Sequence, residues 1–148
     1  MPVALPLGVA PGTIYRHDRL YRDADSGELL PKYLVAFAAL PGGDVVFRLL
    51  TSRQHGRREH PPCYHGDPYP GFFLGIPGGP LTQKSWLDLR GIEDFESEEF
   101  RSELAEKSRE PVTRLGGAVL RAAMECTAAA ADTTHAQEQP IHDQLACL

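Results

Sequence analysis

The sequence has few cysteines and no long apolar run, and both absences narrow the class of protein. Its 148 residues include Cys63, Cys126 and Cys147, an odd number without close spacing. This set does not resemble the disulfide framework of a small secreted domain, so we expect a protein of the reducing cytoplasm. No apolar segment approaches the roughly 18 residues that a membrane span requires, so we expect no membrane contact.

The first residues also lack the pattern of a secretion signal. No basic residue precedes their apolar stretch, and Pro2, Pro6 and Pro11 interrupt it. We therefore expect residues 1–11 to form an extended N-terminal tail.

An overall excess of positive charge is absent as well. The formal net charge is -5, which argues against broad, non-specific attraction to nucleic acid. The charge is unevenly distributed, however, because residues 13–65 carry eight Arg and Lys against six acids, whereas residues 88–110 carry four against nine. A basic surface that binds an anionic ligand is compatible with this distribution.

What the chain does have is a series of short apolar runs separated by turns rich in Gly and Pro. We expect five strands, over Thr13–Arg16, Lys32–Leu40, Val45–Thr51, Phe72–Ile76 and Ser85–Leu89. Between the first two, residues 19–31 are expected to form a long hairpin loop with a turn at Asp25-Ser26-Gly27. The pattern predicts a mainly β protein with a small closed or partly closed barrel over residues 12–110.

Helices are expected only after the barrel strands. Phe95, Phe100 and Leu104 lie at nearly helical spacing, so one or two short helices are expected within Ile92–Lys107. Pro111 begins a longer helical pattern, so a C-terminal helix is expected over residues 111–131. The polar remainder, residues 132–148, is expected to be a flexible tail.

Four stretches, taken in order, resemble the MazF/PemK toxins of bacterial toxin-antitoxin modules. They are Gly12-Thr13-Ile14-Tyr15, Lys32-Tyr33-Leu34-Val35, Leu49-Leu50-Thr51-Ser52 and Ser85-Trp86-Leu87-Asp88-Leu89. The resemblance implies an SH3-like barrel that forms a homodimer. It also implies metal-independent cleavage of single-stranded RNA by attack of the ribose 2′-hydroxyl, restrained by a cognate antitoxin protein, with no cofactor required.

Site residues follow from the same resemblance and from proximity. Lys32 corresponds to the family's catalytic arginine, and Thr51 to its hydroxyl at the strand end, with Ser52 beside it. Arg53 and His55 come next in the chain, where a guanidinium could neutralise phosphate charge and an imidazole could transfer a proton. Lysine lacks arginine's planar fork, and the family's Gly- and Arg-containing approach to the second strand is missing. A non-catalytic barrel that serves as a binding module is therefore the main alternative, in which Thr51 and Ser52 simply end a strand.

The long segment 53–71 is the second candidate region, because its length without periodicity is typical of functional or mobile loops. Arg57 and Arg58 are candidates for RNA-phosphate contacts, and Tyr64 and Tyr69 for stacking against bases. Alternatively, the arginines belong to a solvated loop, and Tyr64 and Tyr69 pack within that loop.

The same segment also carries possible metal ligands. His55, His60, Cys63 and His65 have spacings that could surround a zinc ion, which would make a zinc-dependent hydrolase a further alternative. A metal-free loop is the preferred interpretation, because structural zinc sites usually contain more thiolates.

Overall fold

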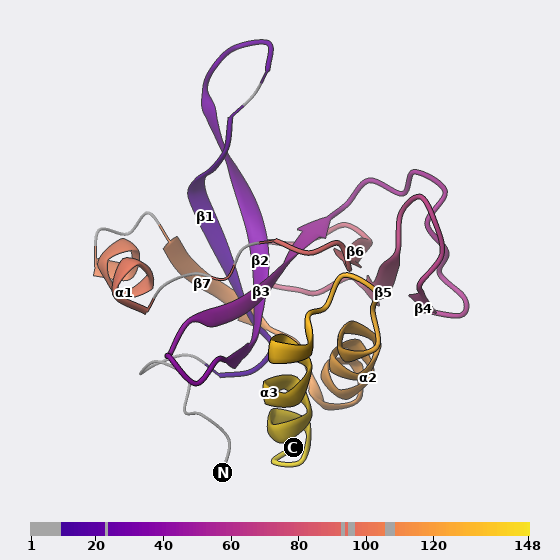
Figure 1. Cartoon of the computed structure of the whole chain (residues 1–148). Helices are drawn as coiled ribbons and strands as arrows, with labels where there is room; N and C mark the ends of the chain where they lie inside the picture. The colour runs from indigo at the N-terminus through magenta and orange to yellow at the C-terminus, as the bar shows by residue number, and fades with distance from the viewer. Residues whose placement is uncertain (1–9, 23, 93, 95–96, 106–108) are drawn as a thin grey trace.

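The computed structural model describes residues 10–22, 24–92, 94, 97–105 and 109–148. Within them the chain forms one antiparallel sheet and three α-helices (Figure 1). The strands are β1 (Thr13–Arg22), β2 (Leu29–Ala39), β3 (Val45–Thr51), β4 (Cys63–Tyr64), β5 (Gly71–Gly75), β6 (Ser85–Asp88) and β7 (Arg109–Arg114). The helices are α1 (Ser97–Ala105), α2 (Gly117–Ala128) and α3 (His135–Leu145). The expected mainly β fold with C-terminal helices is confirmed.

The central strands are apolar on both faces of the sheet. Along β2, Leu34 and Ala36 pack in one hydrophobic cluster, while Val35 and Phe37 pack in another. This alternation follows from the period of two residues in a strand, and β3 repeats it. The continuous apolar run of β2 therefore corresponds to a strand that is buried on both sides.

Helices cover the two faces. α2 and α3 contact each other and contribute Leu120, Met124 and Ile141 to one cluster. α1 lies near β7, and its Phe100 packs against Tyr15 and Phe47 in the other cluster (Figure 1). The expected helix within residues 92–107 is thus present as α1, although Phe95 lies outside the described residues.

The strand order is β4-β5-β6-β3-β2-β1-β7, so hydrogen bonding between the described strands gives an open sheet. The loop between β5 and β6 nevertheless contacts β7, the strand at the other end of the strand order. A Cβ atom added at Gly79 would lie 3.0 Å from the carbonyl oxygen of Val112 on β7, and φ at Gly79 is +57°. Full closure into an SH3-like barrel stays a prediction.

The segment after α1 differs from the expected structure. Residues 109–114 form strand β7 along β1, whereas the helical pattern was expected to begin at Pro111. Pro111 pairs with Tyr15 beside a shift in register, and an edge strand tolerates a residue that cannot donate a backbone hydrogen bond. The helix begins later, at Gly117.

The C-terminal segment is also not a flexible tail. Residues 135–145 form α3, which begins with a capping box between Thr134 and Gln137. Its buried side chains include Pro140, Ile141 and Leu145, which hold the helix against the sheet. The low apolar content of the segment hid this helix, but the Thr134-x-x-Gln137 spacing indicates its start.

Two of the three cysteines are paired, although they are distant in the sequence. Cys63 on β4 forms a disulfide with Cys126 on α2, across a sequence separation of 63 residues, while Cys147 is free and exposed. Only the tertiary fold brings the two together. Among the described residues, no helix is both long and apolar enough to cross a membrane.

Candidate functional site

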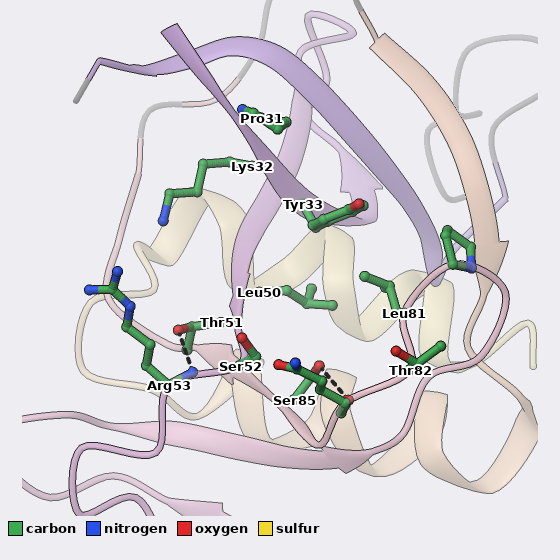
Figure 2. Close-up of a pocket in the computed structure, with 12 residues that line it drawn as sticks. Pro31, Lys32, Tyr33, Leu50, Thr51, Ser52, Arg53, Leu81, Thr82 and Ser85 are labelled. Carbon is green, nitrogen blue, oxygen red and sulfur yellow. Dashed lines mark hydrogen bonds between the residues drawn. The ribbon is translucent and has the colours of Figure 1, made fainter. Parts of the chain in front are cut away.

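A polar cleft of about 340 Å³ lies at one end of the sheet, where β2 begins and β3 ends (Figure 2). Four of the five residues expected to be catalytic line it. The lining residues are Pro31, Lys32, Tyr33, Leu50, Thr51, Ser52, Arg53, Pro80, Leu81, Thr82, Gln83 and Ser85.

Strand register explains why Lys32 and Thr51 share this cleft. Leu34 on β2 pairs with Leu49 on antiparallel β3. Lys32 and Thr51 each lie two residues farther toward the same end of the sheet, so their side chains belong to the same face. Two segments separated in sequence therefore supply a cation and a hydroxyl to one place.

Arg53 follows directly at the end of β3. Its backbone N–H donates a 3.1 Å hydrogen bond to Oγ1 of Thr51, which turns the chain at the cleft edge. Figure 2 shows the side chains of Lys32 and Arg53 extending toward the same side of the cleft. Lys32 is half-buried and Arg53 is exposed, so an anionic ligand can reach the guanidinium from solvent.

The opposite wall comes from the loop before β6, which the sequence analysis did not single out. Thr82 and Gln83 are exposed at the cleft, and the hydroxyl of Ser85 donates to the carbonyl oxygen of Gln83 at 3.1 Å. Tyr33 adds a half-buried aromatic ring. The polar Thr82-Gln83 pair just before an expected strand was the feature of the sequence that could have indicated this wall. Its proximity to Thr51, however, depends on the pairing of β3 with β6.

His55, the fifth expected catalytic residue, does not line the cleft. Its ring lies 5.8 Å from the ring of Tyr69, and its φ is +45°. Among the described residues that line the cleft, none is His, Asp or Glu.

Arg57 is buried within the loop instead of facing solvent. Its guanidinium donates to the carbonyl oxygen of Arg53 at 2.9 Å, lies 4.0 Å from a carboxylate oxygen of Asp88 and stacks 4.8 Å from the ring centre of Tyr69. Burial lowers the pKa of Arg57, and Asp88 opposes this change. These contacts place the guanidinium of Arg57 in the interior of the loop beside the half-buried ring of Tyr69, so this guanidinium does not face solvent.

Arg58 and Tyr64 form a second, more accessible pair. The Arg58 guanidinium lies 4.6 Å from the ring centre of Tyr64, and Arg58 is exposed. The Arg58 carbonyl oxygen accepts a 2.9 Å hydrogen bond from the indole of Trp86 on β6. The backbone of this pair is therefore fixed beside the sheet, and its guanidinium is open to solvent.

No protein-family model, curated protein or solved structure matches this chain. Its function is therefore argued from the cleft and from the chemistry of the residues around it.

The four residues considered as an alternative zinc site, His55, His60, Cys63 and His65, do not form one group of ligands. Among the described residues, the group of potential ligands that lie within 4.8 Å of one another consists of Cys63, His65 and Cys126, without His55 or His60. Cys126 belongs to this group although it lies on α2, so the spacing of residues within the loop could not predict its presence.

Proposed function

We propose that the cleft binds the phosphodiester backbone of single-stranded RNA and that the protein cleaves it without a metal ion. The convergence of Lys32, Thr51 and Arg53 on one cleft carries the proposal. Two cations and a hydroxyl at the end of a rigid strand suit an anionic phosphate, and the nearby Tyr33 ring suits a base that stacks.

The chemistry requires no protein nucleophile. The ribose 2′-hydroxyl loses its proton to solvent water and attacks the adjacent phosphorus, the bond to the 5′-oxygen breaks as that oxygen takes up a proton, and a 2′,3′-cyclic phosphate forms. Arg53 and Lys32 would stabilise the negative charge on the phosphoryl oxygens, and the Thr51 hydroxyl would hold one of them. Lys32 could also donate a proton to the leaving 5′-oxygen, whereas Arg53 remains charged throughout.

The biological setting follows from the resemblance to MazF/PemK toxins. We propose a cytoplasmic toxin of a toxin-antitoxin module, acting as a homodimer. A cognate antitoxin protein would restrain it by occupying the basic cleft, for which an acidic segment is the complementary partner.

A second function is favoured by one observation. Because the described residues that line the cleft include no His, Asp or Glu, the protein could bind an anionic chain without cleaving it. In this non-catalytic binding module, Lys32 and Arg53 would supply affinity only, and the RNA would remain intact.

The experiment incubates the purified protein with a long RNA of mixed sequence in EDTA and maps any new ends. Lys32→Ala, Thr51→Val and Arg53→Ala test the cleft. Lys84→Ala is the matched control, because Lys84 is an exposed cation of the loop before β6 that lies outside the cleft lining and pairs with Glu59 at 3.0 Å.

Discrete cuts that end in cyclic phosphate, persist in EDTA and disappear only in the cleft variants are the expected result. Binding without cuts, weakened by the same substitutions, would replace the nuclease with the binding module. Unchanged behaviour of all three variants would refute the cleft as the site.

A further inference from the structure

The disulfide between β4 and α2 has an imidazole beside both of its sulfur atoms. Nε2 of His65 lies 3.4 Å from Sγ of Cys63 and 3.4 Å from Sγ of Cys126. The same nitrogen lies 2.9 Å from the carbonyl oxygen of Cys126, which holds the ring in place. Three ligand atoms from two elements therefore meet at one point.

This spacing matches that of ligands around a tetrahedral zinc ion. Zinc bonds of about 2.3 Å to sulfur and 2.0–2.1 Å to nitrogen place neighbouring S and N ligands about 3.6 Å apart. The imidazole already lies near this separation from both sulfurs. The Cα atoms of the cysteines are 5.8 Å apart, so rotation of the two side chains is enough to separate the sulfurs once their bond is broken.

The surroundings leave room for a fourth ligand. A shallow cavity of about 340 Å³ borders Cys63, His65 and Cys126 and also includes Glu125, one residue before Cys126 on α2. Cys126 is buried and Cys63 half-buried, whereas His65 and Glu125 are exposed. A metal ion could therefore enter from solvent and complete its coordination with water or with the carboxylate of Glu125.

We propose that reduction of this disulfide creates a zinc site formed by Cys63, His65 and Cys126. A dithiol reductant transfers two electrons and two protons to the disulfide and is itself oxidised to a disulfide. Zinc then displaces the two thiol protons and binds two thiolates and the neutral imidazole, a combination that suits this ion. Either the covalent bond or the metal would thus join β4 to α2.

The site acts on the loop that leads away from the cleft. Residues 53–71 begin at Arg53 and include β4, so a cross-link at Cys63 would restrain this loop in the oxidised state and in the reduced, zinc-bound state. Only the reduced, metal-free state would lose the restraint. The zinc site does not depend on the ribonuclease proposal, because its ligands lie outside the cleft lining.

The test uses Co²⁺ as a spectroscopic probe and Zn²⁺ as its competitor, on full-length protein carrying Cys147→Ser to remove the free thiol. The protein is reduced, freed of reductant under anaerobic conditions and titrated. One equivalent of Co²⁺ per chain, with thiolate-to-cobalt charge-transfer absorption that Zn²⁺ abolishes, is expected. The oxidised protein should give none.

Variants then identify the ligands. Cys63→Ser, Cys126→Ser and His65→Ala should each weaken Co²⁺ binding at least tenfold, whereas His60→Ala, a change at an exposed histidine of the same loop, should not. His65→Ala keeps both cysteines, so it can be purified oxidised and checked by circular dichroism before and after reduction. A reduced, folded protein that binds no Co²⁺, or binding that survives Cys126→Ser, would overturn the proposal.

Discussion

The guanidinium of Arg48 on β3 donates a 3.1 Å hydrogen bond to the side-chain carbonyl oxygen of Gln137 on α3. Arg48 is fully buried, and it also donates to the carbonyl oxygen of Phe47 at 2.8 Å and to the hydroxyl of Thr133 at 3.2 Å. Burial lowers the pKa of Arg48, and nearby carboxylates led by Asp94 oppose this change. The C-terminal helix thus provides polar partners for a charge inside the sheet.

Gln137→Leu should therefore destabilise the fold. The substitution removes an acceptor from a buried cation and also breaks the capping box with Thr134. We expect a loss of about 2–3 kcal/mol in the free energy of unfolding, measured by chemical denaturation. Gln139→Leu, at an exposed position on the same helix, should change it by less than about 0.5 kcal/mol. Equal effects of the two would show that Gln137 is not a partner that Arg48 needs.

Arg57 and Arg58 should respond differently to truncation, although they are adjacent and alike in sequence. Arg57→Ala removes a buried guanidinium and leaves Asp88 and Tyr69 without its contacts, so we expect a loss of about 2–3 kcal/mol. Arg58→Ala removes only an exposed stack on Tyr64 and should cost under about 1 kcal/mol. Thermal unfolding of both variants checks this order, and similar midpoints would contradict the assignment of Arg57 to the loop interior.

Local patterns in the sequence predicted the strands that place Lys32 and Thr51, because an apolar run between turn residues indicates a strand without any knowledge of tertiary contacts. The β3 bounds agree with the expected range, Val45–Thr51. Pro111 shows the limit of such patterns. It favours the start of a helix locally, but pairing with β1 determines the structure at that point.

The candidate site likewise combines residues that local sequence patterns predict with residues that only tertiary contacts bring together. Lys32, Thr51, Ser52 and Arg53 lie close in the cleft because two predicted strands are neighbours. Thr82 and Gln83 reach it only through pairing between β3 and β6, which no local pattern specifies. Likewise, Cys126 contacts His65 because α2 packs on the sheet. The spacing of residues within the loop could not predict this contact.

His17 should make stability depend on pH. Burial lowers its pKa, and the positive charge of Arg109 lowers it further, while the contacting carboxylate of Glu103 and the charge of Asp18 oppose both. The unfolded chain then binds more protons than the folded one below the ordinary histidine pKa of about 6.5. The contribution of His17 to the free energy of unfolding is therefore fully present above about pH 6.5. It decreases as the pH falls below about 6.5, by at most about 1.4 kcal/mol per pH unit.

The measurement compares chemical denaturation of wild type and His17→Gln at intervals from pH 7.5 to about pH 5.5. The variant should lose less stability over this range, whatever its stability at pH 7.5. His60→Gln is the control and should retain the wild-type slope. A variant whose slope equals that of wild type would show that His17 does not titrate differently in the folded and unfolded chains.

Binding of RNA should depend on salt through the two cations of the cleft. For single strands, the slope of log K against log salt is about -0.7 for each phosphate neutralised, so Lys32→Ala and Arg53→Ala should each reduce its magnitude by about 0.7. Fluorescence anisotropy with a short RNA, in EDTA and with a 2′-deoxy substitution at any mapped cut, measures binding without cleavage. Lys84→Ala should retain the wild-type slope, because Lys84 lies outside the cleft lining. Equal slopes for Lys32→Ala, Arg53→Ala and wild type would mean that the RNA phosphates bind elsewhere, whereas reduced slopes without any cleavage would favour the binding module.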